Sequence, residues 1–582
     1  MATKTTAEKL ATIQNGYTLD GATIELGAAI IDGELHKEAQ VRLPLAMMNR
    51  HGLVAGATGT GKTVTLHMMA EQLSTAGVPV FLADIKGDLS GLATAAAGSE
   101  KLTARTESIG QAWAGRTFPV EFLALGGDGN GVPVRATVTS FGPILLSRVM
   151  ELNDTQESSL QLVFHFADKN NLELIDLKDL RSVIQFLTSA EGKDELAALG
   201  GLSKATAGVI LRELVNLEAQ GLERFFGEPE FDTAELLRTA PDGRGVITCL
   251  ELPTLQTKPM LFSTFLMWLL ADLFEDLPEA GDLDKPKLVF FLDEAHLLFN
   301  GASKAFLDAI TTTVRLIRSK GVGIFFVTQT PKDVPSDVLG QLANRVQHAL
   351  RAFTPEDAKA LKATVSTFPV SDYDLEETLT SAGIGEAVIT VMNEKGAPTP
   401  VAHTRLRAPE SVMGPSSDEL VKSTVAGSAL LAKYGTAVDN VSAYEKLTGK
   451  GADPTGAAAP GEPPVPGGTP APGASRNQAD VDAEARRIEE EILGRPSSRP
   501  APAPAPESVN EARAPRTRAP RAPQRSSRER SAPAGGDVVG DLAGALGGAL
   551  GGGLKSMVRS MGTQLGRELL RGVFGTSSRR RR

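Results

Sequence analysis

The sequence predicts an α/β protein that is built on a mainly parallel sheet. Short apolar segments typical of buried strands recur over the first 400 residues, and segments with helical spacing lie between them. Such an alternation of strands and helices is typical of parallel α/β cores. A glycine-rich loop at 56–63 joins an apolar strand segment, 51–56, to a helical segment, 63–73, which is the context in which a phosphate-binding loop occurs.

The predicted elements follow this loop in a regular order. Turn signals at Asp20-Gly21 and Asp32-Gly33 predict a few short antiparallel strands ahead of it. Beyond the loop, helical patterns fill 144–237, and the apolar segment 260–274 predicts one more helix before the second half of the sheet. The strand candidates after the loop are 78–88, 118–125, 134–140, 245–252, 288–292, 323–330, 345–353 and 386–392.

Composition divides the chain near residue 450. The first 450 residues hold 40 Lys and Arg against 56 Asp and Glu, whereas the remainder is basic and rich in proline. The predicted segments are a short N-terminal β segment (1–45), the first part of an ATPase core (46–143), a helical insert (144–240), the second part of the core (241–410), a helical end of the folded body (411–450), a disordered linker rich in Pro, Ala and Arg (451–535) and a Gly-rich, amphipathic, basic tail (536–582).

The loop GATGTGKT has the residue types that a triphosphate requires. Glycines let the backbone N–H groups approach the phosphate oxygens, and the N-terminus of the following helix adds its dipole. Lys62 offers a mobile positive charge, and Thr63 offers a hydroxyl to Mg²⁺. The alternative is a glycine-rich turn without a ligand. The expected nucleotide-binding residues are Gly56, Ala57, Thr58, Gly59, Thr60, Gly61, Lys62, Thr63 and Val64.

Two adjacent carboxylates, Asp293 and Glu294, follow the apolar strand 288–292. We expect Asp293 to hold Mg²⁺, and Glu294 to polarise the attacking water and accept its proton. This pair favours hydrolysis over binding alone. The guanine-reading pattern NKxD does not occur after the loop, so ATP is favoured over GTP.

Three further polar residues are candidates for contact with the γ-phosphate. Gln329 ends a strand candidate and suits a sensing role, although an amide that only caps a loop is the alternative. Arg315 and Arg318 lie three residues apart on one helical face. In a ring of subunits they can reach a neighbour's γ-phosphate, whereas the alternative is a solvated helix end. Arg345 and Arg351 are weaker candidates for that role.

Cysteine usage and hydropathy give two further predictions. Cys249 is the single cysteine and lies in an apolar strand candidate, so we expect a buried thiol. The longest apolar segment, 260–274, is too short to span a bilayer and contains Asp272, so we expect a cytoplasmic protein with no integral membrane segment. In the tail, apolar residues from Leu542 to Leu569 recur at helical spacing; a helix that docks on this or another protein, a membrane-surface contact and disorder all remain open.

The ordered set GATGTGKT, ADIKGD, FFLDEAH, RLIRSKGVG and FFVTQTPKDVPSDVLGQLANRV resembles the HerA-like branch of the HerA/FtsK ATPases over about residues 45–400. This resemblance implies a RecA-like P-loop fold, homo-hexameric rings with ATP between subunits, and translocation or end processing of double-stranded DNA with nuclease partners. It also matches Asp84 to an acidic position near the nucleotide, for which a solvated strand end is the alternative, and it implies that Arg318, with Arg315 as a second candidate, acts on a neighbouring subunit. Since the predicted segment ahead of the core spans only about 45 residues, we expect the N-terminal β-barrel of HerA proteins to be reduced or missing.

Three hypotheses follow for the function. The leading one is a Mg²⁺-dependent, hexameric ATPase that acts as a translocase or helicase on DNA. The rival is a motor or switch that acts on protein in secretion or envelope assembly, with a protein partner bound through residues 536–582. An ATP-regulated scaffold without turnover is disfavoured, because Glu294 is present.

Overall fold

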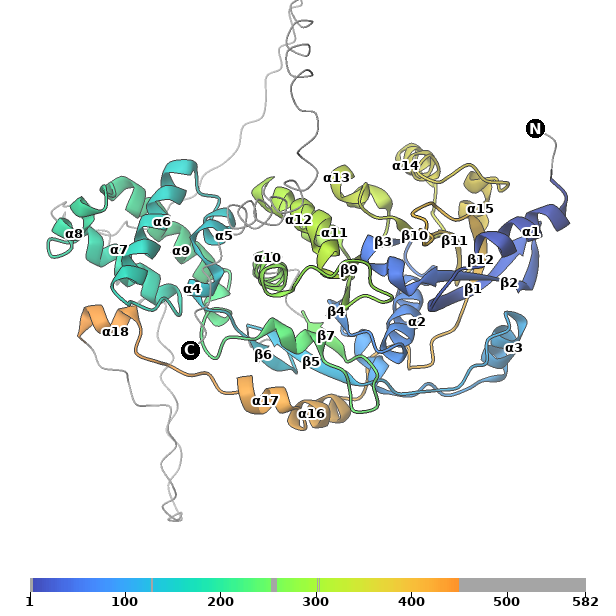
Figure 1. Ribbon diagram of the computed structural model, residues 1–582, viewed down its shortest axis with the longest axis horizontal. Helices are drawn as coiled ribbons and strands as arrows, with labels where there is room; N and C mark the ends of the chain where they lie inside the picture. Colours follow the sequence, from blue (N-terminus) through green and yellow to red (C-terminus); the bar gives the residue numbers. More distant parts are fainter. Residues whose placement is uncertain (1–3, 127–128, 253–258, 301, 303, 450–582) are drawn as a thin grey trace, which may run out of the picture. The chain divides into compact units, whose positions relative to one another are not determined.

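A twelve-stranded sheet organises the part of the chain that the computed structural model describes, residues 4–126, 129–252, 259–300, 302 and 304–449 (Figure 1). Its strand order is β2-β1-β12-β11-β10-β3-β9-β8-β4-β7-β5-β6. All pairs from β10 to β6 are parallel, and the pairs among β2, β1, β12, β11 and β10 are antiparallel. The prediction of an α/β fold with a mainly parallel sheet is therefore confirmed.

The strands are β1 (Thr23–Ile31), β2 (Glu34–Pro44), β3 (Gly52–Ala55), β4 (Val80–Asp84), β5 (Val120–Leu125), β6 (Val132–Val134), β7 (Ile247–Glu251), β8 (Leu288–Leu292), β9 (Val322–Thr328), β10 (Asn344–His348), β11 (Glu386–Thr390) and β12 (Ala402–Leu406).

The central strands are buried because helices cover both faces of the sheet. Every residue of β3, β4, β8 and β9 is buried, as parallel strands require. Successive side chains of a strand point to opposite faces: Phe81 joins a core with α10 (Pro259–Asp276) and α12 (Lys304–Ile317), whereas Leu82 joins a core with α2 (Lys62–Thr75). The layers are thus helix, sheet and helix.

Residues 138–219 form a group of helices that shares the core of α10 and α12. Side-chain caps begin most of them, for example the capping box between Asn153 and Gln156 at the start of α6. In Figure 1 they are the teal and green helices, which lie together. They are α4 (Val138–Phe141), α5 (Pro143–Val149), α6 (Asp154–Lys169), α7 (Leu177–Thr188), α8 (Lys193–Ala198) and α9 (Lys204–Ala219).

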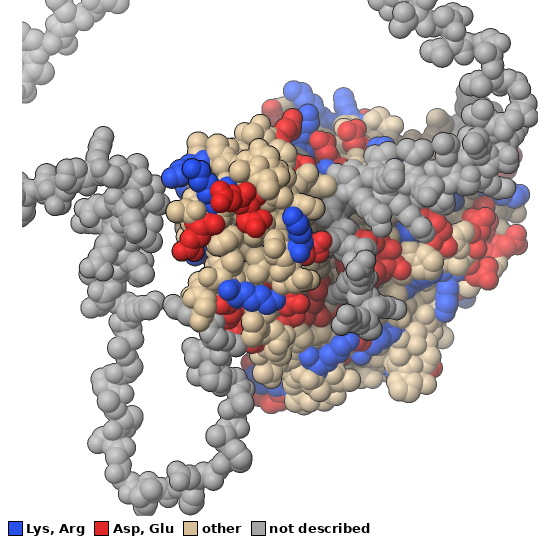
Figure 2. Space-filling model, turned by 60° about the vertical axis from the view of Figure 1, so that its left-hand side comes forward, with Lys and Arg blue, Asp and Glu red and all other residues tan. Residues whose placement is uncertain are grey.

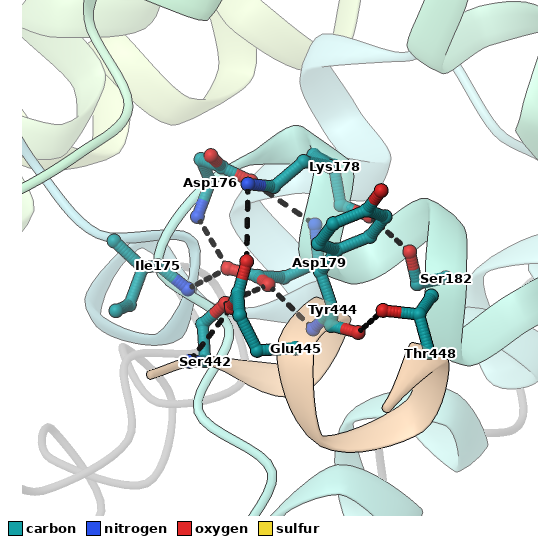
Figure 3. Close-up of polar contacts among 9 residues, drawn as sticks. All are labelled: Ile175, Asp176, Lys178, Asp179, Ser182, Ser442, Tyr444, Glu445 and Thr448. Carbon is teal, nitrogen blue, oxygen red and sulfur yellow. Dashed lines mark hydrogen bonds and ion pairs between the residues drawn. The ribbon is translucent and has the colours of Figure 1, made fainter. Parts of the chain in front are cut away.

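The C-terminal part of the described chain returns to these helices through α18 (Ala443–Thr448) (Figure 3). The buried carboxylate of Asp179 in α7 accepts hydrogen bonds from the backbone N–H groups of Asp176 and Tyr444, at 3.1 and 2.9 Å, and from the Ser442 hydroxyl at 2.5 Å. Lys178 lies 3.4 Å from Glu445. Asp179 therefore caps the first turns of two helices at once.

The remaining helices are α1 (Thr6–Gly16), α3 (Glu100–Ser108), α11 (His296–Phe299), α13 (Ser336–Leu339), α14 (Pro355–Val365), α15 (Leu375–Ser381), α16 (Asp418–Ala426) and α17 (Ala429–Tyr434). Among all helices of the described ranges, none is both long and apolar enough to cross a bilayer.

The structure differs from the sequence prediction in three places. The N-terminal segment contains α1 ahead of its two strands, and β12 was not predicted. The strand predicted at 134–140 is wrong beyond Val134, because the Thr137 side chain accepts a hydrogen bond from the N–H of Ser140 and caps the short helix α4. The predicted linker 451–535 and tail 536–582 lie outside the described residues.

Candidate active site

Four chain segments with polar residues meet at the carboxyl edge of the sheet. Strand β9 lies between β3 and β8, and β4 lies beside β8. Because these four strands are parallel, the segments that follow them emerge at the same edge, where open α/β sheets bind ligands. These segments carry the phosphate loop after β3, Gln329 after β9, Asp293 and Glu294 after β8, and residues 85–88 after β4.

The phosphate loop connects β3 to α2 as predicted. Gly59 and Gly61 have positive φ angles, 78° and 113°, and the tip at Thr58 and Gly59 is exposed. The first turn of α2, which contains Lys62, Thr63 and Val64, has no side-chain cap. Its backbone N–H groups are therefore not used by a capping side chain, and they suit an anion.

Lys62 folds back over this loop. Its ammonium donates to the carbonyl oxygens of Gly56 and Ala57, at 2.8 and 3.2 Å. Burial lowers the pKa of Lys62, while the nearby charges of Glu294 and Asp293 act to raise it. The phosphate loop and the two carboxylates therefore belong to one electrostatic site.

Asp293 and Glu294 form a buried turn directly after β8. The N–H of Glu294 donates to Oδ1 of Asp293 at 2.8 Å, and Glu294 has a φ of 46°, which is uncommon for a residue with a side chain. Burial raises the pKa of Asp293. Burial also acts to raise the pKa of Glu294, but the hydrogen bond and the charge of Lys86 hold it below its usual value.

The two carboxylate oxygens of Glu294 have different surroundings. Oε1 lies 2.5 Å from the ammonium of Lys86. Oε2 is buried and has no hydrogen-bond partner among the described residues, although Nδ1 of His296 lies 3.2 Å away. A buried acceptor without a hydrogen bond is uncommon. The carboxylate is thus held by Lys86 at one oxygen and lies beside His296 at the other.

The donor set suits Mg²⁺ with a nucleotide. Magnesium is commonly held by one or two protein oxygens together with phosphates and waters. Here the hydroxyl of Thr63 and the carboxylate of Asp293 are both at the carboxyl edge of the sheet. Within the described ranges there is no cluster of three acidic, histidine or cysteine ligands.

Gln329 directly follows β9 and is exposed at the same edge. Asp333 contacts the residues on both sides of it, since its carboxylate accepts from the side-chain hydroxyl of Thr328 at 2.8 Å and from the backbone N–H of Thr330 at 3.0 Å. Its side chain can therefore face a ligand held by the neighbouring strands; the sensing role stays a prediction.

The arginines predicted to act on a neighbour do not join this site. Arg315 is in the last turn of α12, and Arg318 begins η5 (Arg318–Lys320), immediately before β9. Both side chains are exposed, and their position before β9 places them at the amino edge of the sheet. Arg345 is the second residue of β10, whereas the exposed Arg351 follows that strand.

Several residues that support the phosphate loop were not predicted from the sequence. Nε2 of His348, at the end of β10, lies 2.9 Å from the hydroxyl of Thr65, and burial lowers the pKa of His348 to about 4. The N–H of Gly385 donates to the carbonyl of Thr60 at 3.0 Å. No local motif marks these residues; only the order of the strands brings them to the loop.

Asp84 ends β4 at the same sheet edge and is buried, so it is not a solvated strand end; its nearness to the nucleotide stays a prediction. Its carboxylate accepts from the N–H groups of Gly87 and Leu89, at 2.6 and 3.0 Å. Burial raises the pKa of Asp84 to about 6. These bonds shape the turn at residues 85–88.

Comparison with known protein families gives one match that spans most of the chain. The family described as "Helicase HerA-like C-terminal" matches residues 30–493. The DNA double-strand break repair helicase HerA of Saccharolobus solfataricus is 22% identical over 385 residues, which are 64% of this chain and 67% of that protein. The protein of the same description from Sulfurisphaera tokodaii is 23% identical over 390 residues, 66% of this chain and 69% of its own length.

The chain is also similar to solved structures of low identity. The bacterial conjugative coupling protein TrwBdeltaN70 is 15% identical with a TM-score of 0.44, and the alignment covers 70% of this chain and 95% of that one. VirB4 of Thermoanaerobacter pseudethanolicus is 16% identical with a TM-score of 0.41, covering 67% and 97%.

Proposed function

The chain belongs to the family of HerA-like helicase C-terminal domains and is a P-loop ATPase of RecA-like fold, and we propose that it is a Mg²⁺-dependent motor that translocates double-stranded DNA as a homo-hexameric ring in the cytoplasm. The proposal that the chain hydrolyses ATP rests on the arrangement of residues at the ends of β3, β9 and β8. This arrangement places a phosphate loop, a polar amide and two adjacent carboxylates, one of them held by Lys86, at one sheet edge.

Each side chain then has one task in hydrolysis. The loop N–H groups and the ammonium of Lys62 bind the phosphates, and Thr63 and Asp293 hold Mg²⁺, which supplies charge neutralisation at the β- and γ-phosphates when bound. Glu294 orients the attacking water and accepts its proton. Gln329 faces the γ-phosphate from the end of β9, the strand between β3 and β8.

A ring of subunits explains the position of the two arginines. Arg315 and Arg318 lie at the sheet edge opposite to the phosphate loop of their own chain. If neighbouring subunits associate head to tail, the amino edge of one subunit faces the nucleotide of the next. An arginine supplied in this way stabilises the charge of the transition state and contributes about 10³-fold or more to the rate.

The two named relatives support DNA as the substrate, since each is described as a DNA double-strand break repair helicase. The net negative charge of residues 1–450 argues against unspecific binding of DNA over the whole surface. On the face that Figure 2 shows, Lys and Arg side chains are interspersed with Asp and Glu, and residues 1–450 carry 56 acidic against 40 basic residues. We therefore expect DNA contact to be confined to a small area, such as the inner surface of a ring.

The test is ATP hydrolysis with and without double-stranded DNA, combined with DNA binding over a series of salt concentrations. We expect stimulation by DNA and binding that weakens steeply with salt, since phosphate contacts release counterions. Hydrolysis without stimulation and without salt-dependent DNA binding would refute the DNA proposal. The motor acting on protein would then take its place.

A further inference from the structure

The turn that follows β4 places a lysine against the proposed catalytic glutamate. Lys86 lies at the carboxyl edge, and its ammonium is 2.5 Å from Oε1 of Glu294 and 3.8 Å from Oδ2 of Asp293. Because β4 pairs with β8 on the side away from β3, Lys86 approaches the carboxylates from the side opposite to the phosphate loop. Lys62 and Lys86 thus flank the carboxylates.

The position of Lys86 is fixed by its own turn. The buried carboxylate of Asp84 accepts hydrogen bonds from the N–H groups of Gly87 and Leu89 and so closes the turn on both sides of the lysine. Gly87 has a φ of 75°, a conformation that glycine adopts without strain. A side chain on such a closed turn loses less freedom when it makes a contact than one on an open loop.

The contact differs from an ordinary surface ion pair. Exposed pairs contribute little to stability because water competes with both partners. The side chain of Lys86 is 46% exposed, but that of Glu294 is 12% exposed, so the carboxylate has lost most of its water. In this environment the ammonium is a strong restraint on the orientation of the carboxylate.

The restraint fixes the carboxylate of Glu294 at one oxygen. Lys86 holds Oε1, whereas Oε2 is buried, lies 3.2 Å from Nδ1 of His296 and makes no hydrogen bond in the described part of the chain. A general base that is oriented by a third group is the usual arrangement. Lys86 is placed to be that third group.

We propose that Lys86 is the positioning residue of Glu294, and that Asp84 sets the turn that presents it. This proposal rests on the proposed function in that Glu294 is the base. Lys86 acts through the carboxylate, so it governs the rate of hydrolysis and not the binding of the nucleotide. A lysine that blocks Glu294 would have the opposite effect, since its removal would accelerate hydrolysis.

The test compares Lys86→Met, Lys86→Arg and Lys178→Met in the full chain. Lys178 is the matched control. Its side chain is 41% exposed and lies 3.4 Å from the carboxylate of Glu445, and it belongs to α7 and not to a segment at the carboxyl edge of the sheet. For Lys86→Met we expect kcat to fall about 10-fold or more, as removal of a positioning interaction does, with affinity for a fluorescent ATP analogue in Mg²⁺ changed less than about 3-fold. Lys86→Arg should restore part of kcat, and Lys178→Met should behave as the wild type.

A double variant separates action through Glu294 from other effects. Residues that act as a unit are not additive, so adding Lys86→Met to Glu294→Gln should cause no further loss in single-turnover hydrolysis. Asp84→Asn should lower kcat in the same direction as Lys86→Met. A wild-type or raised kcat for Lys86→Met, or full additivity with Glu294→Gln, would overturn the role of Lys86.

The controls also distinguish the two proposals. A Glu294→Gln variant that hydrolyses ATP at the wild-type rate would overturn the assignment of the base, and the role of Lys86 with it. An inactive Glu294→Gln beside a fully active Lys86→Met would overturn only the role of Lys86.

Discussion

The backbone N–H of Gly385 donates a hydrogen bond of 3.0 Å to the carbonyl oxygen of Thr60, and so joins the residue before β11 to the phosphate loop. The guanidinium of Arg105 donates in turn to the carbonyl oxygen of Gly385, at 3.0 Å. Gly385 has a φ of 75°. The shape of the loop therefore depends on residues that are remote from it in sequence.

Gly385→Ala should weaken nucleotide binding by about 10-fold, because a positive φ strains alanine and its Cβ would lie 2.6 Å from Nη2 of Arg105. Titration with a fluorescent ATP analogue measures this. Gly396→Ala is the matched control: Gly396 has a φ of 76°, and no atom lies within 4 Å of an added Cβ. Equal affinities for the two variants would show that Gly385 does not support the loop.

Glu294→Gln should bind ATP and hydrolyse it about 10²-fold or more slowly, because the amide cannot accept the proton of the attacking water. Equilibrium binding and phosphate release, measured on the same sample, separate the two effects. Lys62→Ala is the counterpart that should lose ATP binding. It removes the ammonium group that lies against the carbonyl oxygens of Gly56 and Ala57 in the phosphate loop. A near-normal rate for Glu294→Gln would mean that another group is the base.

Local sequence patterns were sufficient to propose those residues of the candidate site that a short segment marks by itself. Lys62 and Asp293 could be assigned because a glycine-rich loop and a strand-terminal acid are short-range signals. The contacts of Gly385 with the phosphate loop and of Lys86 with Glu294 could not be predicted in this way, because they depend on which strands are neighbours in the sheet. The short helix after β6 was missed because a single cap at Thr137 outweighed the strand pattern.

Arg318 should act on the site of a neighbouring subunit. Arg318→Ala alone should lose most hydrolysis, and so should Lys62→Ala alone. Mixing them should restore part of the activity, because a Lys62→Ala subunit offers its intact Arg318 to the intact loop of an Arg318→Ala subunit. Hydrolysis is measured against the mixing ratio, with Arg315→Ala tested in the same way.

The control for this experiment mixes Lys62→Ala with Glu294→Gln. Both changes damage the site of their own subunit, so no intact combination forms and the mixture should stay inactive. Full activity of Arg318→Ala by itself would exclude a role in trans.

Asp179→Ala should destabilise the protein by about 2 kcal/mol or more, because it leaves the first turns of α7 and α18 without their shared cap. Urea unfolding measures the loss. Asp194→Ala, at an exposed position in the first turn of α8, is the control and should change stability by less than about 0.5 kcal/mol. If the two variants are equally stable, α18 is not held by Asp179.

Three buried histidines should make a contribution to stability that is lost in acid, because they stay neutral in the folded chain at pH values at which the unfolded chain protonates them. Burial lowers the pKa of His51 to about 4, from an ordinary value of 6.5. Its Nδ1 accepts from the N–H of Ile324 at 3.0 Å, and its Nε2 lies 2.6 Å from the carbonyl of Val314, so protonation would remove the acceptor. The pKa values of His67 and His348 are likewise lowered to about 4 by burial.

Since the unfolded chain takes up these protons near pH 6.5 and the folded chain only near pH 4, the contribution of these histidines to stability should be full above about 6.5 and fall as the pH decreases towards 4. Each histidine contributes a slope of about 1.4 kcal/mol per pH unit in that range. His51→Gln should be less stable at pH 7.5 but should show a shallower slope in urea unfolding. His165→Gln, at an exposed position, should leave the slope unchanged. An unchanged slope for His51→Gln would mean that His51 takes up its proton in the folded state as readily as in the unfolded chain.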